Sequence, residues 1–137
     1  MSKRAYKFRF YPTDEQAQLL ARTFGCTRVV YNHILNWRKD AFEQNQEKIG
    51  YAGASRKLTA IKMLPEFSWL NEVSCVPLPQ CLRHQQAAFK NFFDKRSSYP
   101  KFKSKHHRQS IALTKSGFKY LDGELYMAKS KEPLAVR

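Results

Sequence analysis

The sequence predicts an α+β fold in which a bundle of four helices is inserted between the first strand and the remaining strands of a β-domain. Three observations predict this fold: side chains alternate over residues 3–11, apolar residues recur at helical spacing between residues 13 and 93, and short β-like runs follow residue 110. The first strand can pair with the last ones only if the helices are an insertion. We therefore expect a strand from about Arg4 to Phe10 to pair with strands after Ser110.

The first predicted strand carries positive charge along one edge. Its aromatic residues point to one side, and the other side carries mostly the cations Arg4, Lys7 and Arg9. Surface strands usually mix both signs of charge, so an all-positive edge favours contact with backbone phosphates over solubility alone. We predict a nucleic-acid-binding role for these three cations.

Two helices are predicted next, over residues 13–40. Residues 13–16 (TDEQ) form a capping box, which is a usual start of a helix. Apolar residues recur at helical spacing on both sides of Gly25, and this predicts a helix-turn-helix with its turn at that glycine. Arg28 and Asn32 fall outside the apolar stripe of the second helix, so we predict that they contact nucleic acid.

The rest of the bundle and the strands are marked by turn-forming residues. A third, short helix around residues 58–64 is ended by Pro65. Pro77 and Pro79 bracket the start of a fourth helix, whose apolar period continues to residue 93. Two or three short strands follow, and residues 121–124 (LDGE) supply a hairpin turn.

Residues 95–119, called the basic segment below, are the strongest local signal of a binding partner. The chain has 25 Lys and Arg residues against 11 Asp and Glu residues, a net charge of +14. Such an excess destabilises a compact protein unless polyanions neutralise it. The basic segment contributes no acid and eight of the cations: Lys95, Arg96, Lys101, Lys103, Lys105, Arg108, Lys115 and Lys119.

Within the basic segment, residues 99–108 interleave aromatic residues with cations, which suits phosphate contacts beside a stacking surface. We predict one phosphate-binding surface made of Arg4, Lys7, Arg9, Lys101, Lys103, Lys105 and Arg108. Tyr99 and Phe102 either stack on bases or fill the core. The alternative is a solvated basic loop without a ligand.

Other classes of protein are not favoured by the sequence. It contains no apolar run of about 18 residues and no charged-then-apolar leader, so we expect no membrane partner and a cytoplasmic location. Cys26, Cys75 and Cys81 form no C-x-x-C pair, and His106 and His107 are adjacent, a spacing that points two rings to opposite sides of an extended chain. We expect no metal site and no cofactor.

A family resemblance emerges from five stretches of the sequence. In this order and spacing, YKFRFYPTDEQ, TFGCTRVVYNHIL, FSWLNEVS, AAFKNFFD and YPKFKSKHHRQS resemble the amino-terminal part of the TnpB or OrfB proteins of bacterial insertion sequences. The resemblance implies a partial β-barrel, the wedge domain, interrupted by a helical recognition domain. Accordingly, residues 1–11 would be the first wedge strand, 12–95 the recognition domain, and 96–137 the basic segment with the remaining wedge strands.

The resemblance also implies partners and binding residues. Family members are RNA-guided DNA endonucleases related to the compact CRISPR nucleases, and older descriptions call them transposases with a helix-turn-helix amino terminus. Their wedge and recognition domains bind the guide RNA and the target DNA, and they read a short duplex motif where the two domains meet. By resemblance, that region falls near Tyr51, Ser55, Thr114 and Lys115.

In the family, a RuvC-like nuclease domain with three metal-binding acids follows, and this chain stops at Arg137 before it. We therefore expect a truncated, nucleic-acid-binding fragment that is not itself an enzyme. Two alternatives remain open. One is a free-standing repressor that places Thr27 to Lys39 in the major groove, although the apolar width of that helix argues that much of it is buried. The other is a non-functional remnant.

Overall fold

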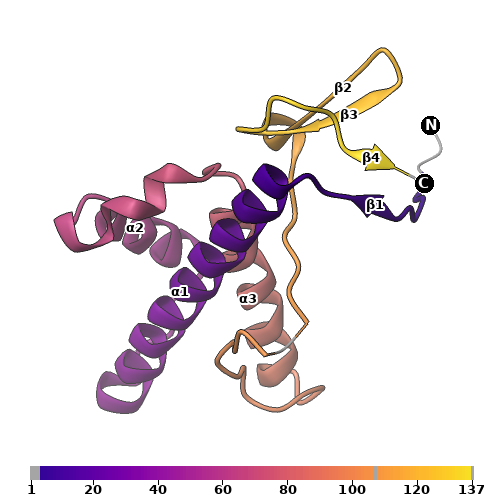
Figure 1. The fold of residues 1–137 in the computed structure, drawn as a ribbon. Helices are drawn as coiled ribbons and strands as arrows, with labels where there is room; N and C mark the ends of the chain where they lie inside the picture. The colour runs from indigo at the N-terminus through magenta and orange to yellow at the C-terminus, as the bar shows by residue number, and fades with distance from the viewer. Residues whose placement is uncertain (1–3, 107, 137) are drawn as a thin grey trace.

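The computed structural model describes residues 4–106 and 108–136, and over these residues the protein is a mixed α+β fold (Figure 1). The helical part consists of α1 (Asp14–Asn45), α2 (Tyr51–Lys62), the 3-10 helix η1 (Pro65–Glu72), α3 (Pro77–Phe93) and the short η2 (Lys115–Gly117). The strands are β1 (Phe10–Tyr11), β2 (Phe118–Leu121), β3 (Glu124–Met127) and β4 (Ala135–Val136). The helices form one body, and the strands lie together at one end of it.

Helix α1 begins at the predicted capping box. The Thr13 hydroxyl accepts a hydrogen bond from the Gln16 amide at 3.2 Å, and the Gln16 side chain accepts one from the Thr13 amide at 3.0 Å. The predicted turn at Gly25 is wrong, because α1 continues through it without a break. A glycine inside a helix costs only about 1 kcal/mol relative to alanine, and burial of Cys26 and Val30, one turn apart on the same face, outweighs that cost.

The core lies where α1, α2 and α3 meet. Ile34 of α1, Leu78 and Leu82 of α3, and Leu70 of η1 are each 0% exposed. Full burial of such a side chain contributes about 1.5–3 kcal/mol, so these contacts hold α1, α3 and η1 together. Leu58 and Ile61 of α2 join the same cluster. Met127 of β3 joins the same cluster, and it ties the hairpin to the bundle.

A buried arginine reinforces this packing. Arg38 is only 5% exposed, and its guanidinium donates to the side chains of Gln85 at 3.2 Å and Gln86 at 2.7 Å and to the carbonyl of Ile49 at 2.6 Å. The guanidinium also lies 4.1 Å from the ring centroid of Phe89. Burial lowers the pKa of Arg38. These contacts join α1, the loop after it and α3, so Arg38 is committed to the interior.

The first strand pairs as predicted but is shorter than predicted. Strand β1 runs antiparallel to β4, with Phe10 opposite Val136, which confirms its pairing with a strand after Ser110. Residues 4–9 are not strand, and Tyr6 and Phe8 are 71% and 66% exposed. Alternation indicates a half-buried strand only where a partner strand and a core are present, and here the ladder covers only two residues of β1.

The predicted hairpin is confirmed. Strands β2 and β3 pair in an antiparallel register that places Leu121 opposite Glu124. Asp122 and Gly123 between them both have positive φ, 53° and 78°, as the tight turn of a two-residue hairpin requires. The two sheets contain two strands each and do not share a strand, so the described residues form no barrel.

Candidate nucleic-acid interface

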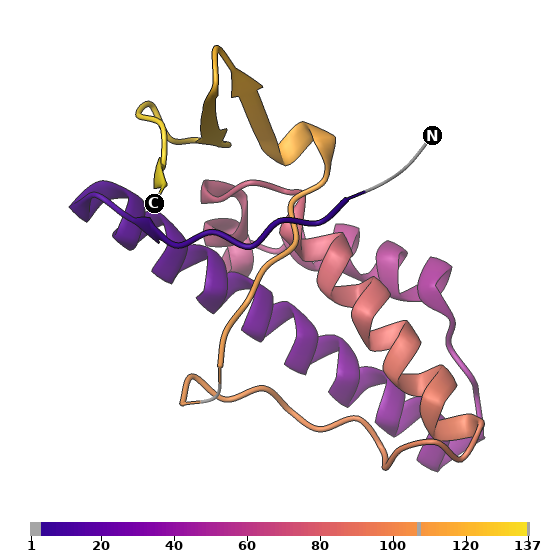
Figure 2. The same ribbon diagram turned by 90° about the vertical axis from the view of Figure 1, so that its right-hand side faces the viewer.

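The basic segment leaves the end of α3 and returns across the bundle toward the strands. Figure 2 shows it looping back past α1 and α3, and its last residues form η2 and the start of β2. Much of its course is without helix or strand, so side-chain contacts with the helices hold it in place.

The first anchor of the basic segment is Tyr99. Its ring packs edge-on against Phe89 and Phe92 of α3, with centroid separations of 5.5 and 5.1 Å. Packing on the bundle is therefore the use that the structure shows for Tyr99. Phe102 is 47% exposed and stays available for stacking.

Two further anchors come from α1. The Asn32 amide nitrogen donates to the carbonyl of Lys103 at 2.8 Å, and the Asn32 carbonyl oxygen accepts from the amide of Lys103 at 2.6 Å. The guanidinium of Arg28 donates to the side-chain oxygen of Gln109 at 3.0 Å. The sequence predicts that both residues contact nucleic acid, and in this structure they fix the backbone and side chains of the basic segment on α1.

The cations of the basic segment face solvent. Lys101, Lys105 and Arg108 are exposed, and the ammonium of Lys103 lies 4.9 Å from the ring centroid of Tyr31. The segment thus presents its charges outward while its backbone is held against the helices, which is the arrangement that phosphate contacts require.

The predicted cations of the amino terminus are also exposed. Arg4, Lys7 and Arg9 lie in the extended residues before β1, which Figure 2 shows on the same side of the bundle as the basic segment. That they and the basic segment form one continuous phosphate-binding surface stays a prediction.

The residues assigned by resemblance to motif reading lie on two elements. Tyr51 and Ser55 are half-buried near the start of α2, whereas Thr114 and Lys115 are exposed at the start of η2. Tyr51 and Leu113, the neighbour of Thr114, pack against the same core cluster. Their role in reading DNA also stays a prediction.

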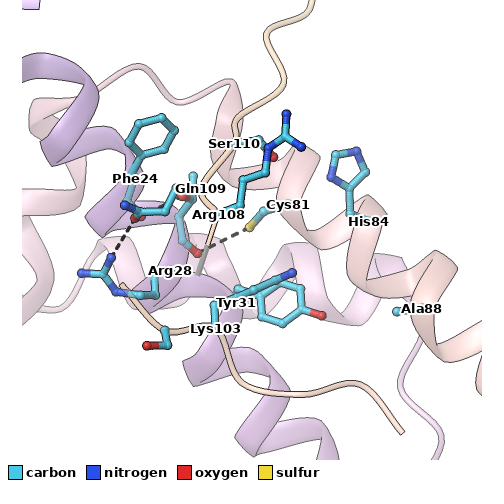
Figure 3. Close-up of a pocket in the computed structure, with 12 residues that line it drawn as sticks. Phe24, Arg28, Tyr31, Cys81, His84, Ala88, Lys103, Arg108, Gln109 and Ser110 are labelled. Atoms are coloured by element: carbon cyan, nitrogen blue, oxygen red, sulfur yellow. Dashed lines mark hydrogen bonds between the residues drawn. The ribbon is translucent and has the colours of Figure 1, made fainter. Parts of the chain in front are cut away.

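A pocket of about 200 Å³ opens between α1, α3 and the basic segment (Figure 3). Its walls include Phe24, Arg28, Tyr31, Cys81, His84 and Arg108. The sequence does not reveal it, because the pocket brings together residues more than fifty positions apart. Neither the apolar period of α3 nor the charge of the basic segment indicates that His84 and Arg108 share a wall.

The thiol in this pocket is not poised for covalent chemistry. The Cys81 sulfur donates to the carbonyl of Leu78 at 3.0 Å. Burial raises the pKa of Cys81 to about 12, although Lys103 acts in the opposite direction. A thiol that keeps its proton at neutral pH is a poor nucleophile, so the pocket is suited to binding by charge, hydrogen bonds and ring contacts.

The part of the chain that the structure describes contains neither a metal-binding cluster nor a membrane-spanning helix. In residues 4–106 and 108–136, no three His, Cys, Asp or Glu side chains gather where they could hold a metal ion. None of the helices in that part of the chain is long and apolar enough to span a membrane.

Comparison with protein families identifies the amino-terminal region. The family model of the OrfB/IS605 helix-turn-helix domain matches residues 1–47. Most of that match forms α1, one uninterrupted helix, so the name of the domain does not describe its shape in this chain.

Three relatives extend the likeness along the chain. One is the "Putative RNA-guided DNA endonuclease" of Streptomyces pristinaespiralis, 52% identical over 136 residues, which are 98% of this chain and 34% of the relative. The "Putative RNA-guided DNA endonuclease InsQ" of Escherichia coli (strain K12) is 33% identical over 101 residues, 74% of this chain and 25% of InsQ. "Virulence protein VsdF" of Salmonella dublin is 30% identical over 112 residues, 75% of this chain and 94% of VsdF.

The chain thus spans about a third of the Streptomyces relative and a quarter of InsQ, but nearly all of VsdF. The resemblance predicted from the five sequence stretches is confirmed. The chain belongs to the TnpB/OrfB family, carries its amino-terminal OrfB/IS605 domain, and is homologous to the amino-terminal third of the longer members.

Proposed function

We propose that this chain is a nucleic-acid-binding region that holds a guide-type RNA and the DNA paired with it. One observation carries the proposal: a segment with eight cations and no acid is anchored across α1 and α3 with its charged side chains exposed. Each phosphate that such a cation neutralises releases counterions, and this supplies affinity without regard to sequence.

The proposal divides the chain as the resemblance implies. Residues 12–95 form the recognition region, and residues 1–11 and 96–137 form a wedge-type region that contains the two small sheets. Arg4, Lys7 and Arg9 extend the phosphate-binding surface, and Tyr51, Ser55, Thr114 and Lys115 read the duplex motif. The names of the two longer relatives support RNA and DNA as the partners.

The repressor alternative is less well supported by the geometry. A recognition helix must present its polar side chains together to the major groove. Over residues 27–39, however, Arg38 is buried, Asn32 is bonded to the backbone of Lys103, and Val30 and Ile34 are in the core. The part of α1 that would enter the groove is therefore the part that packs on the bundle.

Replacing Lys101, Lys103 and Lys105 together by alanine tests the proposal. We expect weaker binding to RNA hairpins and to duplex DNA of many sequences alike, because phosphate contacts carry no sequence information. Fluorescence anisotropy at several salt concentrations measures this. The slope of log K against log salt should become shallower by about 0.7–0.9 for each phosphate that is no longer neutralised.

A matched triple variant controls for the reduced net charge. Lys48, Lys90 and Lys131 are exposed lysines outside the basic segment, and replacing them by alanine removes the same charge. This control should retain most of the affinity and the original salt slope. Equal reductions of affinity in both triple variants would show that net charge, and not this surface, governs binding; no binding by the wild-type chain would refute the proposed function itself.

A further inference from the structure

The pocket between α1, α3 and the basic segment is large enough for a ring system. A cavity of about 150 Å³ lined by apolar side chains accommodates benzene, whereas sites for drug-sized ligands occupy about 300–1,000 Å³. The volume of about 200 Å³ found here lies between these limits. This volume suits one aromatic ring system, and the open side of the pocket leaves room for a group attached to that ring.

The lining of the pocket has two parts. Its less exposed part contains the half-buried ring of Phe24, the buried ring of Tyr31 and the buried side chain of Thr27. Its rim carries the cations Lys103 and Arg108, both exposed, and the ring of His84. In Figure 3 the side chains of Phe24, Arg108 and His84 extend on the same side, above Cys81 and Gln109. A ligand that fits both parts is flat and aromatic at one end and anionic at the other.

We propose that this pocket takes one unpaired nucleotide, with its base inside and its phosphate at the cationic rim. The inference rests on the proposed function, because a single-stranded part of the bound RNA is the source of the nucleotide. Unpaired bases are the parts of RNA that proteins splay out and place against aromatic rings or guanidinium planes. Arg28 lines the pocket and also donates to Gln109, so the bond that anchors the basic segment on α1 joins two walls of the pocket.

The neighbouring alanines of α3 provide a matched pair of variants. Ala88 is half-buried and lines the pocket, whereas Ala87 is exposed and does not. Ala88→Leu fills the pocket without removing a cation, and Ala87→Leu adds the same side chain on solvent. Ser110→Leu fills the pocket from the basic segment and replaces Ala88→Leu if that variant does not fold.

The experiment uses three small probes and one strand. AMP, adenosine and inorganic phosphate are titrated into the full chain while the ring resonances of His84 are followed by NMR. A single-stranded RNA that carries 2-aminopurine reports separately on a base that leaves the stack. We expect AMP to bind more tightly than adenosine or phosphate. Ala88→Leu should lower the affinity for AMP at least about tenfold, since even one methylene can change the affinity of a pocket by that factor. Ala87→Leu should behave like the wild type.

The outcomes separate the two proposals. Equal AMP affinity in Ala88→Leu and Ala87→Leu, or a response to phosphate as strong as that to AMP, would overturn the nucleotide pocket while leaving phosphate binding by the basic segment intact. The nucleotide pocket would be supported if Ala88→Leu binds the single-stranded RNA with an unchanged slope of log K against log salt but no longer gives the 2-aminopurine signal. If the wild-type chain binds no strand, the proposed function fails, and the AMP titrations still decide whether the pocket takes a nucleotide.

Discussion

The helical bundle and the strand end of this protein are built in different ways. In the bundle, Ile34, Leu78 and Leu82 are completely buried, whereas in the sheets Tyr120 and Leu121 are 69% and 51% exposed. The bundle thus has a core of its own, and the strands contribute little apolar burial. The basic segment joins the two regions and is anchored on the bundle side. A binding surface has a fixed geometry where it is attached to a well-packed region. We therefore expect the part of the basic segment that is anchored on the bundle to discriminate best between ligands.

The largest expected effect tests the difference in burial directly. Leu78→Ala removes a fully buried side chain and should lower the free energy of unfolding by about 2–5 kcal/mol. Leu121→Ala, at a half-exposed position of β2, should change it by less than about 0.5 kcal/mol. Urea denaturation followed by circular dichroism measures both. Similar destabilisation in the two variants would mean that the strands and the bundle form one cooperative core.

Local signals in the sequence predict where helices and hairpins begin or turn better than they predict how far a helix or strand extends. The capping box at Thr13, the prolines in the first turn of α3 and the Asp-Gly turn of the hairpin each act within a few residues, and all three are confirmed. The prediction at Gly25 is wrong because the cost of a helical glycine is small beside the burial of its neighbours. Of the strand predicted from about Arg4 to Phe10, the part over residues 4–9 is wrong, because alternation does not reveal whether a partner strand is present.

The candidate site is only partly accessible from sequence. The acid-free run of the basic segment is visible in composition, so its cations can be named. The contacts that anchor the basic segment on α1 cannot be predicted from the sequence, since the hydrogen bonds from Asn32 to Lys103 and from Arg28 to Gln109 span 71 and 81 positions. No periodic pattern encodes such bonds, and the same argument applies to the pocket that they close.

A second expected effect concerns the stability of the bundle at high pH. The Cys81 thiol has an ordinary pKa of 9.0, and burial raises it in the folded protein to about 12. Between these values the folded state keeps a proton that the unfolded state has released. The free energy of unfolding should therefore fall as pH rises, by about 1.4 kcal/mol per pH unit for this group. Burial also raises the pKa of Cys26 and Tyr31, and both act in the same direction.

Urea denaturation at several pH values between about 8 and 10.5 measures this slope. Cys81→Ala and Cys81→Ser both remove the titrating thiol, so they should share a shallower pH dependence even if their stabilities at pH 8 differ. That shared slope separates ionisation from packing. If both variants keep the wild-type slope of the free energy of unfolding against pH, ionisation of the Cys81 thiol does not lower the stability of the bundle at high pH.

The smallest expected effect on stability concerns the basic segment, which joins the bundle to the strands. Asn32→Ala removes both hydrogen bonds to the backbone of Lys103, which are solvent-accessible, so we expect stability to fall by only about 1 kcal/mol. The effect on the basic segment should be clearer, because its central anchor on α1 is gone. The amide of Lys103 should exchange its hydrogen faster, and nucleic acid should bind more weakly with an unchanged salt slope, since no cation is removed.

Asn36 supplies the matched control, because it is an exposed asparagine one turn further along α1. Asn36→Ala should leave the exchange of the Lys103 amide and the affinity for nucleic acid as they are. If Asn32→Ala also leaves the Lys103 amide protected, the segment is held by Tyr99 and Gln109 without Asn32. If the amide is released but affinity is unchanged, the basic segment binds as a flexible chain, and the rigidity of the bundle then contributes nothing to recognition.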